Sequence, residues 1–305
     1  MNFIFIGSAI AFTGLFLLER IIPLRHETHT LRKRLLVNAC VTLLAFVMNS
    51  LTVLPSSLFA LNQAEKWHFG LVHLLGLPNW AGNFIAFLLL DLTYYYWHRA
   101  NHRFSVLWRF HNVHHIDPDM DVSTGFRFHF IEILFSTAFR VAQVGLIGAS
   151  FFAFAAYELV FQLNTLFHHS NVKLPLWWER SLNGILVTPR MHGIHHSQVQ
   201  QETNANFSVI FPWWDRLHKT LRLNIPQAAI AIGVPAYTQP EDNALVSVLL
   251  MPFRPQRDYW HDSHQSTVER DPQVLGDDPT RMVDWDAVNA QSSNQESSAQ
   301  QQSCS

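Results

Sequence analysis

Three tight clusters of histidine stand out in this sequence, and their spacing suits metal binding. The clusters are His98 with His102, then His111 with His114 and His115, then His192 with His195 and His196. Imidazole nitrogen is a good ligand for zinc, copper, iron and nickel. A structural zinc site is usually complete with four ligands, so eight imidazoles exceed what one ion takes. The spacing therefore indicates a centre of two metal ions.

Each cluster has the spacing of one helical face, because residues three or four apart on a helix are neighbours. Histidine pairs occur on ordinary surfaces, but the same triplet twice beside a further pair is not expected by chance. His169, in the pair His168-His169, is a candidate ninth ligand. His129 is a candidate tenth, with a plain hydrogen bond as an equal alternative.

Asp91 is the carboxylate that the pattern links to these histidines. It lies seven residues before His98, and at 100° per residue Asp91, His98 and His102 fall within a strip roughly 40° wide. A carboxylate inside a membrane helix is costly and usually has a partner. We give Asp91 a candidate catalytic role as the group that orients a ligating imidazole. The alternative is a buried aspartate bonded to a tyrosine hydroxyl.

The sequence lacks the motifs of several other classes of enzyme and binding protein. The two cysteines, Cys40 and Cys304, support neither a disulfide framework nor a cysteine-based zinc site. The sequence has no His-Glu-x-x-His motif of zinc proteases and no Gly-x-Ser-x-Gly motif of serine hydrolases. It has no basic patch of the nucleic-acid-binding type. Nitrogen ligands, with oxygen as a supplement, are what the chain offers a metal.

The elements that must position these histidines are predicted to be membrane helices. The chain is 49% hydrophobic and 14% charged, against about 25% charged in an average soluble domain. A spanning helix needs about 20 mainly apolar residues. Candidate spans are 1–18, 35–61, 80–97, and a helical hairpin of 130–150 and 151–167, whose polar first arm spans fully or only dips into the bilayer. We predict an all-α integral membrane protein with about four spanning helices.

Orientation follows from the positive-inside rule. The loop between the first two spans carries five basic residues and should face the cytoplasm: Arg20, Arg25, Arg32, Lys33 and Arg34. Counting crossings from there, all three histidine clusters emerge on the cytoplasmic side, whether the hairpin crosses twice or not at all. We therefore expect a cytoplasmic helical cap that holds the dimetal site.

We divide the chain into four parts. Residues 1–79 are the N-terminal transmembrane helices, 80–222 the catalytic domain, and 223–256 a membrane-adjacent segment. Residues 257–305 hold nine acidic and three basic residues. We expect this acidic polar tail to be disordered.

In its motifs the chain resembles the fatty acid hydroxylase and sterol desaturase superfamily of membrane di-iron oxygenases. The resemblance is carried by His98-Arg99-x2-His102, His111-x2-His114-His115 and Thr188-Pro189-x2-His192-x-Ile194-His195-His196. Supporting matches are Arg127-x-His129-x2-Glu132, His169-Ser170-Asn171, Asn206-Phe207 and Trp214-Asp215-Arg216-x3-Thr220. The motifs cover about residues 80–222 in the family's order. Thr165 departs from the pattern, since fatty acid 2-hydroxylases of this family often carry histidine there.

The resemblance implies two iron ions and O2-dependent hydroxylation of an unactivated C–H bond in a sterol or fatty acyl lipid. Electrons would come from a carrier such as a b-type cytochrome or a ferredoxin, at a bacterial inner membrane or an endoplasmic reticulum. Desaturation at the same centre is the alternative within the family. A non-redox, zinc-dependent membrane protein is the alternative outside it, and zinc is a possible occupant in purified protein.

Overall fold

The computed structural model describes residues 2–283, and the regular structure in that range is helical. Besides helices and turns, this part of the chain has only isolated β-bridges, such as Pro23 with Val172. The all-helical fold predicted from the sequence is therefore confirmed.

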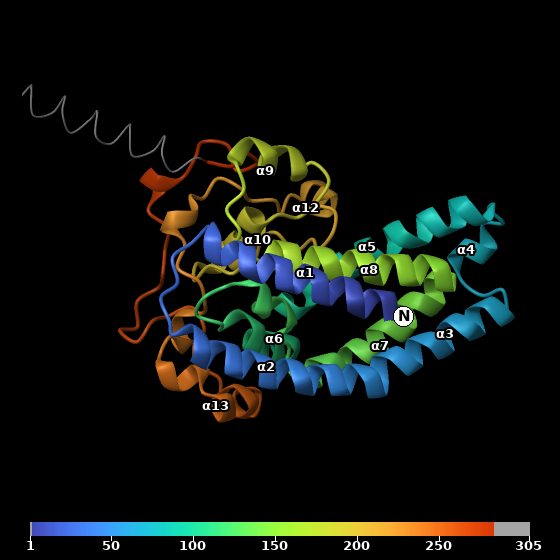
Figure 1. Ribbon diagram of the computed structural model, residues 1–305, viewed down its shortest axis with the longest axis horizontal. Coiled ribbons are helices and arrows are strands. Elements are labelled where there is room, and N and C mark those ends of the chain that lie inside the picture. The colour runs from blue at the N-terminus through green and yellow to red at the C-terminus, as the bar shows by residue number, and fades with distance from the viewer. Residues whose placement is uncertain (1, 284–305) are drawn as a thin grey trace, which may run out of the picture.

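Long helices run roughly along the longest axis of the molecule (Figure 1). They are α1 (Asn2–Ile21), α2 (Leu31–Met48), α3 (Leu54–Lys66), α5 (Asn79–Arg103), α7 (Phe130–Ile147) and α8 (Phe151–His169). A π-helical turn, Asn49–Val53, joins α2 to α3 without a break. Pro55 follows this turn, and a proline without an N–H cannot continue the regular hydrogen-bond ladder.

The connection between α7 and α8 follows from its residues. Gly148 ends α7 in the left-handed conformation, at φ 70°, which glycine adopts without a steric cost. The Ser150 side chain then accepts a hydrogen bond from the Ala153 N–H and caps α8. The two helices diverge from this turn, because α8 lies against α1 and α5 whereas α7 lies mainly against α3.

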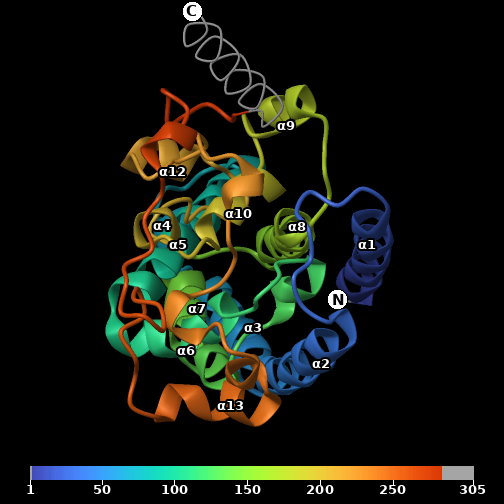
Figure 2. The same ribbon diagram turned by 90° about the vertical axis from the view of Figure 1, so that its left-hand side faces the viewer.

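Short helices gather at one end of this bundle, which Figure 2 shows facing the viewer. They are α6 (Ser105–His115), α9 (Leu176–Leu182), α10 (Pro189–His195), α11 (Gln200–Thr203), α12 (Trp213–His218) and α13 (Leu245–Leu250). Single 3-10 turns lie among them at Val122–Phe126, Gln227–Ala229, Pro235–Tyr237, Pro240–Asn243, Met251–Phe253 and Pro272–Val274. The remaining short helix, α4 (Leu71–Leu74), lies near the other end of the bundle (Figure 1). We call the short-helix end the cap.

Of the three apolar clusters among residues 2–283, the two largest hold these layers together. One lies between the long helices and includes Ala86, Leu90 and Tyr157, each fully buried. The other lies under the cap and includes Val113 and Val248. Small residues in the first core let the long helices approach closely, which is how helices pack in a lipid environment.

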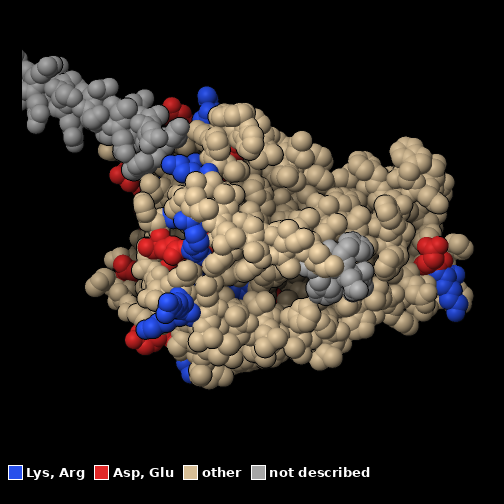
Figure 3. All heavy atoms as spheres, viewed as in Figure 1, with Lys and Arg blue, Asp and Glu red and all other residues tan. Residues whose placement is uncertain are grey.

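The charged residues divide the surface into zones. On the face shown in Figure 3, Lys, Arg, Asp and Glu gather at the cap and at the opposite end, with an uncharged band between them. Two stretches among the described residues are long and apolar enough to cross a membrane, Leu31–Leu74 and Phe130–Ile147. The expected count of about four spans is larger and remains a prediction.

Polar residues inside the long helices are paired with one another. Arg140 of α7 is buried and forms an ion pair with Glu158 of α8, with 3.0 Å between the charged atoms. Gln143 donates to the Leu90 carbonyl and the Thr93 hydroxyl of α5. Intramembrane polar groups are usually paired in this way, and these contacts join three long helices.

The C-terminal segment differs from the expected disordered tail where it is described. Arg270 forms an ion pair with Glu202 of α11 at 2.8 Å, and the Met282 side chain is buried. The Met282 carbonyl also accepts a hydrogen bond from Arg180 of α9. Charge in this segment is therefore used for contacts with the cap. The rest of the predicted tail, 284–305, lies outside the described residues.

Candidate metal centre

Four helices bring the histidines of the sequence clusters to one place in the cap. His98 and His102 lie in the last turns of α5, and Phe104 follows in an extended conformation that ends the helix. The chain then turns into α6, which carries the second cluster, while α8 ends at His169 and α10 carries the third. Segments up to 98 residues apart in sequence therefore converge at the cap end of the bundle.

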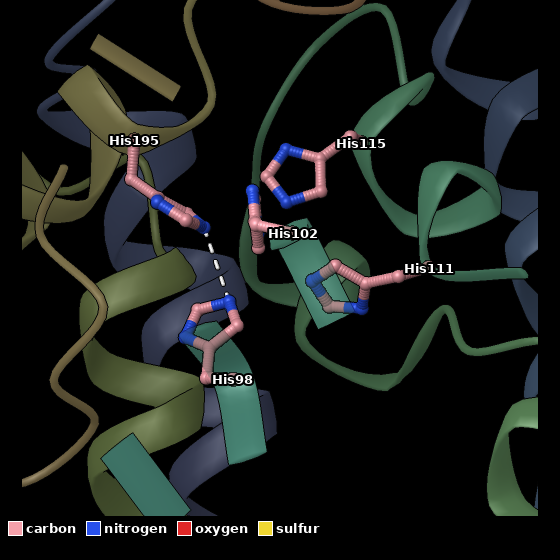
Figure 4. A group of neighbouring side chains, drawn as sticks. All are labelled: His98, His102, His111, His115 and His195. Atoms are coloured by element: carbon pink, nitrogen blue, oxygen red, sulfur yellow. Dashed lines mark hydrogen bonds between the residues drawn. The ribbon is translucent and has the colours of Figure 1, made fainter. Parts of the chain in front are cut away.

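Nine imidazoles form two adjacent groups within which the potential ligand atoms all lie within 4.8 Å of one another. The five-histidine group consists of His98, His102, His111, His115 and His195. The four-histidine group consists of His114, His169, His192 and His196. All are buried except His102, which is partly buried. Figure 4 shows the rings of the five-histidine group pointing toward a common centre.

The sequence clusters do not correspond to the two groups. The adjacent residues His114 and His115 enter different groups, and so do His195 and His196. Neighbouring side chains on a helix diverge by about 100°, so a single helix can supply ligands to two ions that lie side by side. Each triplet thus bridges the two groups.

Hydrogen bonds fix the ring orientation in the five-histidine group. The Nδ1 of His98 lies 2.8 Å from the Phe207 carbonyl oxygen, and that of His195 lies 2.7 Å from the Ala205 carbonyl oxygen. A carbonyl only accepts, so Nδ1 carries the proton and Nε2 of each neutral ring is bare. Yet the two Nε2 atoms face each other at 3.1 Å (Figure 4, dashed line). Two bare nitrogens cannot hydrogen-bond, whereas a cation between them would satisfy both.

The four-histidine group shows the same arrangement. The Nδ1 of His169 lies 2.8 Å from the Thr165 carbonyl oxygen, and that of His114 lies 3.3 Å from the Arg127 carbonyl oxygen. Their Nε2 atoms are again 3.1 Å apart. Two nitrogens that bind one ion side by side at about 2.1 Å lie roughly 3 Å apart. Both groups therefore fit metal ions in their spacing.

Burial keeps these imidazoles in the form that binds metal. Loss of hydration lowers the pKa of His195 to about 3, and it lowers the pKa of His196 well below its usual value, with His114 adding to the effect. These two rings are therefore neutral at physiological pH. Within residues 2–283, Nε2 of His111 and both ring nitrogens of His115 have no hydrogen-bond partner. Buried polar atoms without a partner are costly, and metal binding would remove that cost.

Glu132 is the carboxylate that reaches a ligating imidazole. It lies in the first turn of α7, is buried, and its Oε1 is 2.8 Å from Nδ1 of His111. Asp91, which we expected to orient a histidine, instead accepts hydrogen bonds from the Trp214 indole N–H and the Phe211 backbone N–H. Helix periodicity alone groups Asp91 with His98, whereas Phe211 and, in α12, Trp214 hold that carboxylate.

Removal of the Glu132 charge tests its role. We expect Glu132→Gln to weaken metal binding in the five-histidine group by about 10–100-fold, because carboxylates that orient ligating histidines have effects of that size. Equilibrium dialysis of the purified protein against ferrous iron, under anaerobic conditions, measures the affinity. Glu158→Gln is the matched control, since Glu158 belongs to the neighbouring helix and pairs with Arg140. Equal affinities in both variants would contradict the role.

Two further histidines lie near the centre but outside both groups. The His129 side chain accepts a hydrogen bond from the Ile131 N–H and caps α7, while its Nε2 lies 3.2 Å from the Leu249 carbonyl oxygen. The structure thus gives His129 the hydrogen-bonded position that was the alternative to a ligand. The His168 ring is buried beside that of His192, with 4.1 Å between centroids.

Aromatic rings lie against histidines of both groups. Phe128 stacks on His114, with ring centroids 4.6 Å apart and an angle of 9°. The Phe207 ring centroid lies 5.2 Å from that of His102, and the centroid of the buried Trp108 indole lies 4.8 Å from it. An apolar enclosure around a metal strengthens electrostatic interactions and limits solvent access.

A known protein family and several characterised proteins are similar to this chain, and the family match covers the part that forms this centre. The family model described as Fatty acid hydroxylase matches residues 83–220. Ornithine lipid hydroxylase OlsE of Rhizobium tropici is 32% identical over 150 residues, which are 49% of this chain and 44% of that protein. Alkylglycerol monooxygenase of Homo sapiens is 28% identical over 156 residues, or 50% and 33% of the two chains.

Cholesterol 25-hydroxylase of Mus musculus is 28% identical over 152 residues, which are 49% of this chain and 50% of that protein. The chain thus spans half or less of the length of these curated relatives. No solved structure matches it. These relatives differ in the lipids that their names give.

Proposed function

Because residues 83–220 belong to the fatty acid hydroxylase superfamily, we propose that the chain is a membrane-bound, non-haem di-iron lipid hydroxylase that uses O2. The observation that carries this proposal is the pair of adjacent, buried histidine groups whose bare Nε2 atoms face each other at 3.1 Å. General acid–base chemistry has nothing to act on in an unactivated C–H bond. A metal centre that activates O2 supplies the oxidant that this bond requires.

The ligand set supports iron in preference to zinc. Five and four imidazoles in two neighbouring groups exceed the four ligands of a closed zinc site, and zinc has no redox chemistry. Imidazole also suits iron. The five-histidine group would hold one ion and the four-histidine group the other, and a site with fewer protein ligands leaves more room for a co-substrate. Zinc remains a possible occupant of purified protein.

Membrane placement follows from the distribution of charge. The histidine groups lie in the charged cap, next to the uncharged band of Figure 3. The basic residues of the α1–α2 connection lie at the same end, where Arg34 forms an ion pair with Asp117 and Arg25 bonds Gln227. The positive-inside rule supports the proposal that this end faces the cytoplasm. A lipid tail would then approach from the bilayer, and a soluble electron carrier from the cytoplasm.

Labelled oxygen tests the reaction. We expect a host that expresses the full chain under isotopically labelled O2 to accumulate a lipid one oxygen atom heavier, with the label in the new hydroxyl group. Untargeted lipidomics identifies the substrate class, whether sterol, fatty acyl or another lipid. The control is the His192→Ala variant, which removes a ligand of the four-histidine group. A product two hydrogens lighter and free of label would indicate desaturation, and no difference from the control would contradict both reactions.

A further inference from the structure

The loop Ala205–Asn206–Phe207 supplies two of the contacts that orient ligands in the five-histidine group. Its first and last carbonyls accept from Nδ1 of His195 and of His98, at 2.7 and 2.8 Å. These two histidines come from α10 and α5, and their Nε2 atoms face each other across the group. A change in the path of this loop would therefore rotate two ligands at once.

Asn206 holds the loop in an unusual backbone conformation. It is fully buried and has a φ of 56°, in the left-handed region that asparagine tolerates better than most residues. This conformation lets the carbonyls on either side of Asn206 reach two different rings. The Asn206 side chain donates to the Met191 and Arg222 carbonyls and accepts from the Arg222 N–H, at 2.7–2.9 Å. Met191 lies in α10, directly before His192, so these bonds join the loop to a ligand-bearing helix.

Asp215 fixes the other side of the same loop. Its buried carboxylate accepts hydrogen bonds from the Phe207 and Ser208 backbone N–H groups at 2.9 and 2.8 Å. It also accepts from the Thr220 hydroxyl at 2.6 Å. The peptide N–H of Phe207 is thus held by Asp215 while the Phe207 carbonyl orients His98. Asp215 thus acts on His98 through the loop backbone, since none of these hydrogen bonds goes to a histidine.

We propose that Asn206 and Asp215 are positioning residues of the five-histidine group, which act on His98 and His195 through the 205–207 carbonyls. This inference rests on the proposed function only in taking the group to bind a metal ion. The four-histidine group uses different carbonyls, those of Thr165 and Arg127. The 205–207 carbonyls therefore orient ligands of the five-histidine group, whereas His169 and His114 are oriented by other carbonyls.

Metal binding by the full-length protein in detergent tests the inference. Ferrous iron is titrated under anaerobic conditions, bound iron per chain is counted, and cobalt(II) substitution gives a visible spectrum that reports ligand geometry. We expect Asp215→Asn and Asn206→Leu to weaken iron binding at one of two sites by about 10–100-fold, with an altered cobalt spectrum. Asn206→Gly keeps the left-handed backbone but loses the side-chain bonds, so its affinity should lie between those of wild type and Asn206→Leu.

Matched controls separate positioning from general destabilisation. Asn224→Leu and Asp242→Asn change a buried asparagine and a buried aspartate that hold other loops, through Gly276 and through Arg257. Both should bind two ions with the wild-type spectrum. If Asn206→Leu does not fold, Asp215→Asn and Asn206→Gly decide the question. Two wild-type sites in all three variants would overturn the inference, whereas a wild-type protein that binds no iron would overturn the proposed function instead.

Discussion

Replacement of His195 by alanine is expected to abolish O2-dependent lipid oxidation and to remove one of two bound iron ions. Changes in groups that only orient a ligand commonly lose about 10–100-fold in metal affinity or activity, so loss of the ligand itself should cost more. His195 is fully buried, and its Nε2 lies 3.1 Å from that of His98. Iron per chain, measured with the purified variant, and lipidomics of the expressing host report the two effects separately.

The matched control for His195→Ala is His129→Ala. His129 is equally buried and lies near the centre, but its hydrogen bonds go to the backbone of residues 131 and 249. We expect this variant to retain two ions per chain. Loss of iron from His129→Ala, or retention of both ions by His195→Ala, would mean that the ligand groups are assigned incorrectly.

Residue type and spacing were enough to predict which histidines gather. His98 with His102, and the two triplets, lie on helical faces whose period is local information. The sequence could not predict how the rings divide, because that depends on how α5, α6, α8 and α10 pack. The division separates His114 from His115 and His195 from His196, so neither triplet in the sequence corresponds to one group.

The residues that orient the ligands were harder to predict, for a related reason. Asp91 shares a helix face with His98, but α12, more than 100 residues later in the chain, covers it through Trp214. Glu132 reaches His111 from another helix. Its signal in the sequence is a carboxylate in an apolar stretch, which requires a partner without saying which one. The carbonyls of Ala205 and Phe207 could not be predicted from residue type, because every residue has a backbone carbonyl.

The long helices could be predicted from the sequence, because the length of an apolar stretch is a property of each segment alone. The segments 35–61, 80–97, 130–150 and 151–167 correspond to α2 with α3, α5, α7 and α8. Composition alone could not show that α7 and α8 diverge to contact different helices. It also could not show that Arg270, in the segment predicted to be a disordered tail, pairs with Glu202 of the cap.

A buried ion network holds the loop that follows the second histidine cluster. Asp117 is fully buried between two arginines, 3.2 Å from Arg34 and 3.5 Å from Arg127. It also accepts hydrogen bonds from Asn38 and from the Thr124 hydroxyl, at 2.9 and 2.7 Å. Through these partners, one carboxylate joins α2 to the loop between α6 and α7. The Arg127 carbonyl in turn faces Nδ1 of His114, so the network reaches the four-histidine group.

Asp117→Ala is therefore expected to lower the free energy of unfolding by about 3–5 kcal/mol, the usual cost of removing one partner of a buried ion pair, because Arg127 loses its carboxylate partner while Arg34 keeps Asp121. Thermal unfolding in detergent, without added metal, measures this loss apart from iron binding. Asp278→Ala is the control, because the Asp278 side chain is exposed and accepts hydrogen bonds from nearby Thr280. Surface substitutions usually change the free energy of unfolding by less than about 0.5 kcal/mol. Asp117→Ala should also bind iron more weakly at the four-histidine group, since the Arg127 carbonyl is no longer held in place. Unfolding at the wild-type temperature would show that the two arginines find other partners, and that the network does not set the position of this loop.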